Sequence, residues 1–242
     1  MVRKLLATLA ATLCVGPALA GPPAPAKGPS VARISGPFTH ANLTVFLLHG
    51  ESTLPNRPFL TLQEALDQKK IVVHETSNVN QLAVENVSGD SEVFLMTGDI
   101  VKGGKQDRAI AFDMILPPKS GQVPIGSFCV ESGRWRQRGA EAAGQFAGSM
   151  NQVVGKDLKN AINRDNDQQR VWQEVAKAQQ KLSGNVGMPV AAAESPSSLQ
   201  LPLENRKVQE KLEAYEKALA NAKLDKDVIG VVFAVNGEFS GA

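Results

Sequence analysis

Alternating apolar and polar positions dominate the chain from about residue 43 to residue 135 and predict strands. Each run is short, rich in β-branched residues, and ended by residues typical of turns. The expected strands are LTVFLL, KIVVHET, QLAVENV, EVFLMTGDIV, DRAIAFDMIL and VPIGSFCVE. The sequences SGDS, KGGKQ and PPKSGQ form the expected turns between the later runs. Many short strands at this spacing indicate an antiparallel, sandwich-like sheet.

Apolar residues at helical spacing occur once between residues 43 and 135, and they dominate the pattern after about residue 140. TLQEALDQ predicts one or two helical turns that begin at Thr61. Two later segments, DQQRVWQEVAKAQQKL and RKVQEKLEAYEKALANAKL, repeat apolar residues at helical spacing. Their stripes are Val171, Trp172, Val175, Ala178 and Leu182 in the first segment and Val208, Leu212, Tyr215 and Leu219 in the second. We therefore expect two main helices.

Three other segments complete the expected order of elements. EAAGQFAGSM is rich in small residues and is expected to form a loop or an irregular helix. NVGMPVAAAESPSSLQLP has the composition of a long loop. VIGVVFAVNGEF is typical of a buried strand followed by a turn at Asn236 and Gly237. A β-rich N-terminal part, two main helices and a closing strand indicate a single α+β domain.

Residues 1–20, MVRKLLATLAATLCVGPALA, have the pattern of a signal peptide. Basic residues precede a short apolar run, and Ala18-Leu19-Ala20 provides the small residues required before cleavage. The run is shorter than the roughly 20 residues that a membrane span takes. Lipidation at Cys14 is disfavoured because Leu13 stands where a small residue is required. We expect export to the periplasm or the medium, with cleavage near Ala20.

The sequence that follows the expected cleavage site, GPPAPAKGPSVARISGP, is rich in Pro, Gly and Ala and has no periodicity. This composition predicts a flexible linker over residues 21–37. Residues 38–242 then form the single domain.

Charge excludes one class of partner. The chain has 26 basic and 24 acidic residues, and two of the basic ones lie in the signal peptide, so the mature chain carries 24 of each. Neutralising phosphates drives non-selective binding to nucleic acids, so a formally neutral chain does not predict a nucleic-acid partner. No later segment is apolar enough to predict a membrane span.

The segment GDIVKGGKQDR (98–108) places glycines beside a lysine, as phosphate-binding loops do. Gly98 and Gly103 have the required separation, but Gly104 occupies the lysine position of that motif and Gln106 the hydroxyl position. The strand-like sequence that follows supplies no helix N-terminus for a phosphate. We therefore expect a hairpin turn in which Gly103 and Gly104 adopt positive φ.

Polar side chains end this turn and recur in CVESGRWRQR. Gln106, Asp107 and Arg108 either face solvent or form a cluster that orders the loop or reaches a ligand. If CVESGRWRQR is a strand, its three arginines project from one face, where they could bind a carboxylate or phosphate. We expect Arg136 and Arg138 to be solvated on an edge strand. Glu131 and Arg134 are expected to form a buried ion pair, and Trp135 to anchor the core or its rim.

Cysteine and histidine usage predicts no metal and no cofactor. Cys129 is the single cysteine outside the signal peptide, which excludes an internal disulfide. It lies in an expected strand, so a buried, inert thiol is favoured over a nucleophile. His40, His49 and His74 are too widely separated to show a zinc-binding spacing.

Four stretches resemble, in order, the ARG- and rhodanese-phosphatase-superfamily-associated protein domain family: HANLTVFLLHG, LTLQEALDQKKIVVHE, FLMTGDIVKGGKQDR and CVESGRW. The signatures GxKQxR and CVExGRW are specific in combination, and the resemblance extends over residues 38–238. It implies one domain with a β-rich first part, and it implies no activity. The family motif positions are Gly104, Lys105, Gln106, Arg108, Cys129, Glu131, Gly133, Arg134 and Trp135. Family chains continue into more helix beyond GVVFAVNG, so we expect a truncated or divergent C-terminus here.

The leading functional hypothesis is an exported, soluble binding or interaction module whose partner is a small anionic ligand or a protein. Its site would lie where GGKQDR meets ESGRW. The expected ligand-binding residues are Gln106, Asp107, Arg108, Glu131, Arg134 and Trp135, with Arg108 and Arg134 contacting the anionic group. The alternative is a hydrolase of phosphate or acyl esters with Asp107 or Glu131 as general base. A thiol enzyme built on Cys129 comes third.

Overall fold

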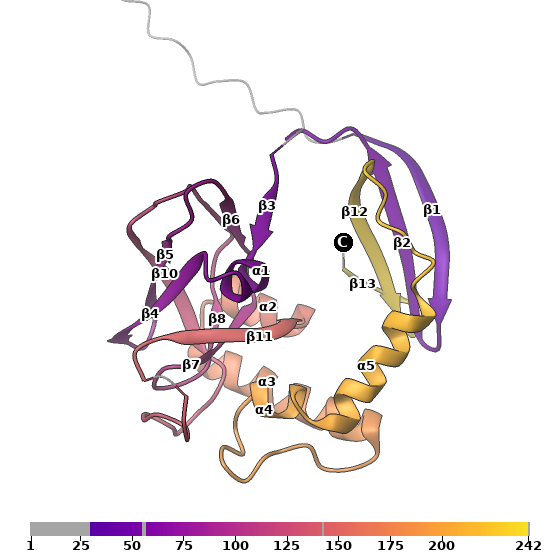
Figure 1. Ribbon diagram of the computed structural model, residues 1–242. Coiled ribbons are helices and arrows are strands. Elements are labelled where there is room, and N and C mark those ends of the chain that lie inside the picture. The colour runs from indigo at the N-terminus through magenta and orange to yellow at the C-terminus, as the bar shows by residue number, and fades with distance from the viewer. Residues whose placement is uncertain (1–29, 55–56, 142, 242) are drawn as a thin grey trace, which may run out of the picture.

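The computed structural model describes residues 30–54, 57–141 and 143–241 (Figure 1). The expected signal peptide, and the expected linker as far as residue 29, lie outside the described residues. Residues 31–37 were also assigned to the linker, but they belong to strand β1 (Val31–His40). The Pro and Gly residues of this segment led to the prediction of a linker. In the structure, Gly36 and Pro37 lie in a β-bulge of β1 opposite strand β2, where such residues are accommodated.

The main body contains a six-stranded sheet with the order β11-β7-β8-β10-β5-β4 and antiparallel pairing throughout. Its strands are β4 (Ile71–Asn78), β5 (Gln81–Asn86), β7 (Asp99–Gly103), β8 (Arg108–Ile110), β10 (Gln122–Cys129) and β11 (Phe146–Val153). The hydrophobic pattern predicted β4, β5 and β10. EVFLMTGDIV and DRAIAFDMIL were each expected to form one strand, but each is divided into two strands, of which only Asp99–Gly103 and Arg108–Ile110 belong to this sheet. The pattern did not predict β11.

Strand β11 corrects the prediction of a loop or irregular helix for EAAGQFAGSM. Ala and Gly have weak strand propensity, which hid the element. Their small size has a packing reason, because the side chain of Gln63 lies directly against the backbone of Gly148. A Cβ atom at Gly148 would overlap the end of the Gln63 side chain, which would have to move aside.

A second, three-stranded sheet has the order β3-β6-β9, in which β3 and β6 are parallel. Its strands are β3 (Phe59–Thr61), β6 (Glu92–Leu95) and β9 (Met114–Leu116). The helical turns expected at Thr61 form helix α1 (Leu62–Asp67), whose N-terminus is a capping box. The Thr61 side chain accepts a hydrogen bond from the Glu64 amide, and the Glu64 carboxylate accepts one from the Thr61 amide.

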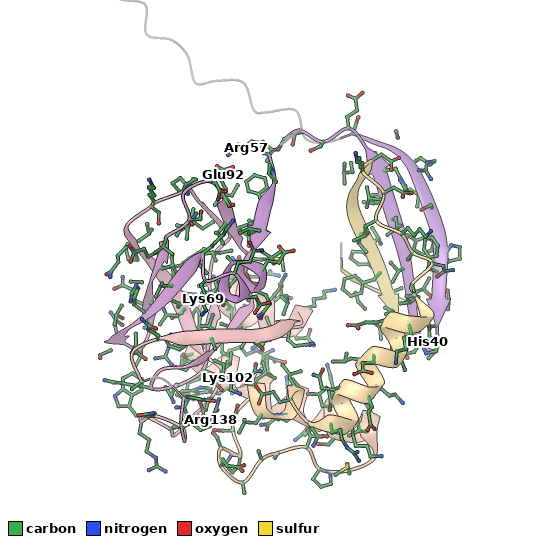
Figure 2. All side chains as sticks on the ribbon, in the orientation of Figure 1. His40, Arg57, Lys69, Glu92, Lys102 and Arg138 are labelled. Carbon is green, nitrogen blue, oxygen red and sulfur yellow. The ribbon has the colours of Figure 1, made fainter. Side chains whose placement is uncertain are left out.

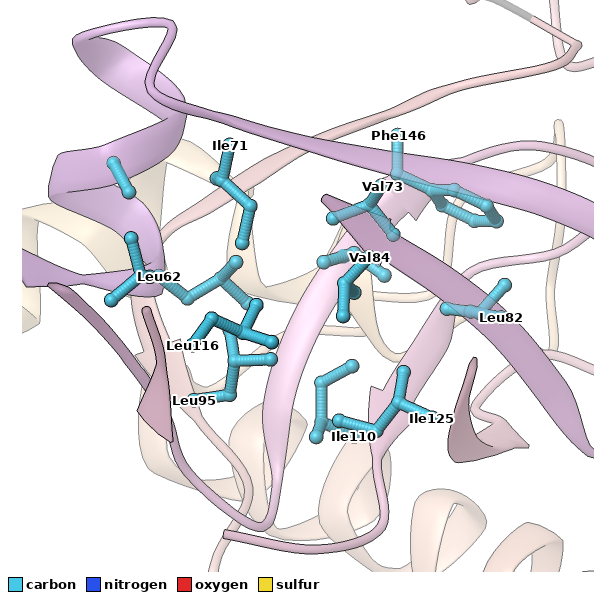
Figure 3. Packing of buried hydrophobic residues seen from close by; sticks show 13 residues of the cluster. Leu62, Ile71, Val73, Leu82, Val84, Leu95, Ile110, Leu116, Ile125 and Phe146 are labelled. Carbon is cyan, nitrogen blue, oxygen red and sulfur yellow. The ribbon is translucent and has the colours of Figure 1, made fainter. Parts of the chain in front are cut away.

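The first hydrophobic core lies among α1 and these two sheets (Figure 3). Its members come from elements far apart in sequence: Leu62, Ile71, Val73, Leu82, Val84, Leu95, Ile110, Leu116, Ile125 and Phe146 are labelled in the figure. Each buried Leu, Ile or Val side chain stabilises the fold by about 1.5–3 kcal/mol relative to leaving it exposed. This core fixes the hairpin that ends at Arg108.

The helices follow the sheets and cover a second core. They are α2 (Lys156–Asn160), the π-helical turn η1 (Ala161–Asp165), α3 (Gln168–Val186), α4 (Gln200–Leu203) and α5 (Arg206–Ala218). The two main helices were predicted, and Val171 and Val175 of the α3 stripe are buried as expected. The second core includes Ile100, Val130, Leu158, Ile162 and Leu199. Within the described residues, no helix is both long enough and apolar enough to cross a membrane.

The first and last strands of the chain form a separate four-stranded sheet, with the order β1-β2-β12-β13. Its other members are β2 (Leu43–Gly50), β12 (Val228–Val235) and β13 (Glu238–Gly241). The turn at Asn236 and Gly237 was predicted, and both residues have positive φ. Figure 1 shows this sheet standing beside the main body, with α5 leading to it. The chain is thus a single α+β domain with a β-rich N-terminal part and closing strands, as the sequence predicted.

Candidate functional site

The GGKQDR segment forms the expected turn between β7 and β8. Gly103 and Gly104 have φ values of 126° and 54°. A Cβ atom at Gly104 would lie 2.9 Å from Glu75 Oε2 and would also overlap the Phe146 ring. The turn is closed by Asp107, whose Oδ1 accepts a hydrogen bond of 3.0 Å from the Gly103 amide. Glycine is therefore required here for its backbone and for space.

Asp107 and Glu131 form a buried ion-pair network with two arginines. Arg134 Nε donates to Glu131 Oε1 at 2.7 Å, and Arg134 Nη2 lies 2.7 Å from Glu131 Oε2. Arg138 donates to both oxygens of Asp107, at 2.9 and 3.0 Å. The side chains of Asp107 and Glu131 are 0% exposed, and those of Arg134 and Arg138 are 6% and 9% exposed. The expected Glu131–Arg134 pair exists, as part of this larger network.

Helix α3 and the loop that follows it complete the network with contacts that the sequence analysis did not predict. Ser195 Oγ donates to Glu131 Oε1, and Ser198 Oγ donates to Asp107 Oδ2 at 3.2 Å. The indole N–H of Trp172 donates to the backbone carbonyl of Glu131 at 3.2 Å. Sequence separations of 64 and 91 residues for the two serine contacts left no local signal that could have linked them.

The arginine-rich segment is not a strand, which corrects the prediction of three arginines on one face. Residues 131–140 form bends and turns. Arg136 is exposed as expected, but Arg138 turns inward and also pairs with Glu141 at 2.9 Å. Lys102 lies 3.5 Å from the same Glu141 oxygen, and Figure 2 shows Lys102 and Arg138 on the same side of the main body. The prediction of a solvated Arg138 is therefore wrong. The buried carboxylates of Asp107 and Glu131 require a compensating positive charge, which Arg138 supplies together with Arg134.

The pKa values of the two central carboxyl groups shift in opposite directions, although burial acts on both in the same way. Burial raises the pKa of Asp107, and the nearby charge of Glu131 adds to this effect against the hydrogen bonds from Arg138. Burial also opposes ionisation of Glu131, but hydrogen bonds from Arg134 and Ser195 outweigh it and lower its pKa. The pKa of Arg138 is raised, because its bonds to Asp107 exceed the effect of its own burial. Ionised arginines thus hold the network together.

Arg108 lies outside this network and is less completely bonded. Its side chain is 0% exposed, and its Nη1 donates to the backbone carbonyl of Gln106 at 3.0 Å. Its Nη2 is 3.7 Å from Glu75 Oε2, which is an ion pair without a hydrogen bond. Within the described residues, Arg108 Nε and Nη2 have no hydrogen-bond partner. Gln106 itself is held by Glu131, whose carbonyl accepts from Gln106 Nε2 at 3.0 Å.

Trp135 covers Arg108 at the surface. The guanidinium carbon of Arg108 is 5.6 Å from the centroid of the Trp135 ring, and Lys105 Nζ is 5.1 Å from it. Two cations therefore share one aromatic ring, which attracts them through its quadrupole. Trp135 is 44% exposed, so it belongs to the rim. The structure brings all six predicted site residues into one region.

Cys129 is a buried thiol beside this region. It is 2% exposed, and its Sγ lies 3.7 Å from the carbonyl oxygen of Val79. Burial raises the pKa of Cys129 above its ordinary value, although the charge of Arg108 opposes this. The favoured prediction of an internal thiol agrees with this placement. Among the described residues, no group of three or more His, Cys, Asp and Glu side chains is arranged to hold a metal ion.

A large cleft lies elsewhere, between the helices and the four-stranded sheet. It has a volume of about 830 Å³ and is lined mainly by α2, α3, β12 and β13. None of the predicted site residues lines it. Its walls come from both ends of the fold, so the sequence analysis had no basis for expecting it.

Comparison with known proteins gives one match. No curated protein and no solved structure matches the chain. The family model of the ARG and Rhodanese-Phosphatase-superfamily-associated Protein domain matches residues 32–242. This range begins within β1 and includes both motif segments as well as the closing strands. The chain therefore belongs to the ARG and Rhodanese-Phosphatase-superfamily-associated Protein domain family.

Proposed function

We propose that the protein is an exported, soluble binding module that recognises an anionic group through Arg108. The observation that carries this proposal is the bonding of the Arg108 guanidinium. Two of its nitrogen atoms have no hydrogen-bond partner among the described residues, although the side chain is fully buried. Buried polar groups are nearly always hydrogen-bonded, and exceptions call for a functional explanation. A carboxylate or phosphate oxygen would satisfy both nitrogen atoms.

Arg134 supports this proposal less well than the sequence suggested. Its nitrogen atoms are bonded to Glu131 and to three backbone carbonyls, those of Gly103, Gly104 and Arg136. An anion at Arg134 would have to displace bonds that hold the turn and the irregular segment together. We therefore assign Arg134 to support of the site and Arg108 to the ligand.

Trp135 acts as a movable cover in this proposal. Its exposed ring lies 5.6 Å from the guanidinium of the fully buried Arg108, on a segment without regular secondary structure. Lys105 stands beside it, so the two cations outweigh the single carboxylate of Glu75 that faces Arg108. A rotation of the indole would open a path to Arg108 and leave Lys105 at the entrance.

Calorimetric titration with inorganic phosphate, sulfate and citrate at fixed ionic strength tests this function. We expect saturable binding of at least one of these anions, and a loss of about 10- to 100-fold in affinity for Arg108→Lys, because a hydrogen bond to a charged group contributes about 1.5–3 kcal/mol. Arg136→Ala is the matched control, since it removes an exposed arginine from the same segment. Equal affinities of the Arg108→Lys and Arg136→Ala variants would contradict the assignment.

Fluorescence of Trp135 provides a second readout. The chain has two tryptophans, so Trp172→Phe leaves Trp135 as the sole indole reporter. We expect a saturable change in its emission with the anion that binds. The same titration in sodium chloride controls for screening of surface charges.

The alternative, an ester hydrolase that uses Asp107 or Glu131, has less support. Both carboxylates are fully buried and each accepts hydrogen bonds from an arginine. A general base must reach the proton that it removes, directly or through one water molecule. A substrate panel on the wild type and on Asp107→Asn decides the point: turnover that this variant loses would favour the hydrolase.

Export is part of the proposal and has its own test. The expected cleavage site follows Ala20. Expression of the full chain in a bacterium, followed by fractionation and N-terminal sequencing, should give a product that begins at Gly21 outside the cytoplasm. A full-length product confined to the cytoplasm would contradict it.

A further inference from the structure

We propose that the cleft between the helices and the four-stranded sheet is a second binding site, which takes a long-chain carboxylate, the anion of a fatty acid. Its volume of about 830 Å³ lies within the range of roughly 300–1,000 Å³ that is typical of small-molecule sites. Such sites are mostly apolar, with a few polar groups that orient the ligand. The cleft is independent of the site proposed around Arg108, because neither Arg108 nor Trp135 is among the described residues that line it.

The floor of the cleft is part of the second hydrophobic core. Val154, Leu158 and Leu199 line the cleft, belong to that core and are 6%, 4% and 4% exposed. Ala178 of α3 also lines the cleft and packs against the same core. A packed interior resists displacement, so the floor is formed before a ligand binds.

Exposed apolar side chains form the other walls. Val153 at the end of β11, Phe233 of β12 and Phe239 of β13 line the cleft and are 39%, 37% and 63% exposed. In Figure 1, β12 and β13 lie on the side of the four-stranded sheet that is nearer the main body. Exposed apolar side chains that gather in one hollow are typical of a ligand groove. An alkyl chain would cover them, and each methylene group removed from water strengthens binding about 4-fold.

Most of the charged groups around the cleft neutralise one another. The charged lining residues are Lys156, Lys159, Lys177, Lys181, Asp157, Glu174 and Glu238. Lys177 Nζ is 2.8 Å from Glu174 Oε1, and Lys181 Nζ is 3.4 Å from Asp157 Oδ2. These two pairs therefore leave two lysines and one carboxylate to be considered.

Of the two remaining lysines, Lys159 has a carboxyl group as its neighbour. Burial raises the pKa of Asp99, and the Met96 amide and then the charge of Lys159 oppose this shift. Lys156 has no ion pair among the described residues, and its Nζ lies 5.7 Å from the centroid of the Phe239 ring. Glu238 directly precedes Phe239 in β13, so its side chain leaves the strand on the opposite face from that ring.

The position of Lys156 selects the chemistry of the ligand. One cation without a partner, beside an exposed aromatic ring and an apolar floor, matches a ligand with a single anionic head and an apolar tail. The carboxylate would pair with Lys156, and the tail would lie between α3 and the strands that carry Phe233 and Phe239. A ligand with several negative charges would find only one uncompensated lysine here.

Calorimetric titration of the full chain with decanoate, decan-1-ol and decyltrimethylammonium, each below its micelle concentration, tests this site. We expect saturable binding of decanoate that is tighter than binding of the other two probes. Lys156→Glu should weaken decanoate about 10-fold, leave decan-1-ol unchanged and favour decyltrimethylammonium, because it replaces an attraction by a repulsion. Lys211→Glu, on an exposed lysine of α5 outside the cleft, is the matched control. No saturable binding of decanoate, or equal effects of the two lysine variants, would overturn the proposal.

The apolar wall has its own variant. Phe239→Ser should weaken all three probes about 10-fold, whereas Leu224→Ser, at a residue that is 72% exposed and outside the cleft, should weaken none. Equal effects of these two variants would show non-specific association and would overturn the site. Arg108→Lys should bind decanoate as the wild type does. A loss of affinity in Arg108→Lys and not in Lys156→Glu would place the carboxylate at Arg108 and contradict the inference.

Photolabelling locates the bound chain directly. A decanoic acid that carries a diazirine in its alkyl chain should label peptides from α3, β12 or β13, and excess decanoate should suppress the labelling. Mass mapping of the labelled peptides reads out the position without relying on affinity. Labelling confined to other parts of the chain, or labelling that decanoate does not suppress, would contradict a site in the cleft.

Discussion

Arg138 donates two hydrogen bonds to the carboxylate of Asp107, at 2.9 and 3.0 Å, although 31 residues separate them in sequence. Asp107 ends the glycine turn, and Arg138 lies on the irregular segment after Glu131. This contact therefore connects the turn that holds the first family motif to the segment that follows the second motif. A carboxylate buried to this extent is stable only while its charge is compensated.

Removal of Arg138 should destabilise the protein strongly. Breaking a buried ion pair by removing one partner costs about 3–5 kcal/mol, because the other charge stays buried without compensation. We expect Arg138→Ala to lower the free energy of unfolding by this amount in a urea titration. Arg136→Ala, which removes an exposed arginine two residues earlier, should change it by less than about 0.5 kcal/mol. Similar values for the two variants would mean that Asp107 is compensated in another way.

The contribution of Glu131 to stability should disappear in acid. Its folded-state pKa is below its ordinary value, mainly because hydrogen bonds from Arg134 and Ser195 outweigh burial. A carboxyl group of this kind stabilises the fold fully above its unfolded pKa of about 4.3, and loses that contribution as the pH falls through the folded pKa. The difference in unfolding free energy between the wild type and Glu131→Gln should therefore be largest near pH 7 and shrink below about pH 4.

The pH dependence of the stability that Asp107 contributes should have the opposite sign to that of Glu131. Burial raises the pKa of Asp107, so the folded state binds the proton more tightly than the unfolded state does. The stability of the wild type relative to Asp107→Asn should therefore rise as the pH falls from neutral through the raised pKa. Parallel urea titrations of both variants between pH 7 and pH 4 check this. Parallel pH profiles for the two variants would contradict the assignment of opposite shifts.

The sequence predicted most of the fold because alternation and helical periodicity are local signals. Strands β4, β5 and β10 and helix α3 follow from their own residues. β11 does not, since its Ala and Gly residues have weak strand propensity, and its pairing with β7 is a contact between segments far apart in sequence. The pairing of β2 with β12 is likewise a property of the whole chain, and no local pattern indicated it.

The sequence predicted which residues form the candidate site, but it did not predict the hydrogen bonds among them. The two motifs indicated that Asp107, Arg108, Glu131 and Arg134 are special, and the structure brings them together. Which arginine is fully bonded depends on backbone carbonyls and on Arg138, whose inward turn follows from bends that the sequence pattern does not encode. Sequence reasoning could therefore locate the region but could not distinguish Arg108 from Arg134.

Gly104 should tolerate no side chain. Its φ of 54° is unfavourable for other residues, and a Cβ atom would overlap Phe146 and approach Glu75 Oε2 to 2.9 Å. Gly133 also has positive φ, but a Cβ atom there meets nothing within 4 Å. We expect Gly133→Ala to cost about 1–2 kcal/mol from its backbone alone, and Gly104→Ala to cost more. Urea titrations of the two variants separate steric overlap from backbone strain.

Gly89→Ala is the control for the two glycine variants, because neither steric overlap nor backbone strain is expected at Gly89. Nothing lies within 4 Å of a Cβ atom there, and its φ is outside the range that disfavours side chains. Gly89→Ala should leave the free energy of unfolding within about 0.5 kcal/mol of the wild type. A Gly104→Ala variant no less stable than Gly133→Ala would show that Phe146 and Glu75 can move aside.

The thiol of Cys129 should be unreactive while the protein is folded. Cysteine reacts as the thiolate, and burial raises the pKa of Cys129 and encloses its sulfur. A Cys14→Ser variant leaves Cys129 as the sole cysteine, so alkylation by iodoacetamide reports on it alone. We expect slow modification at neutral pH and rapid modification in denaturing urea, followed by mass spectrometry. Equal rates in the two conditions would show that the sulfur reaches solvent in the native state and would revive the possibility of a thiol enzyme beside Arg108.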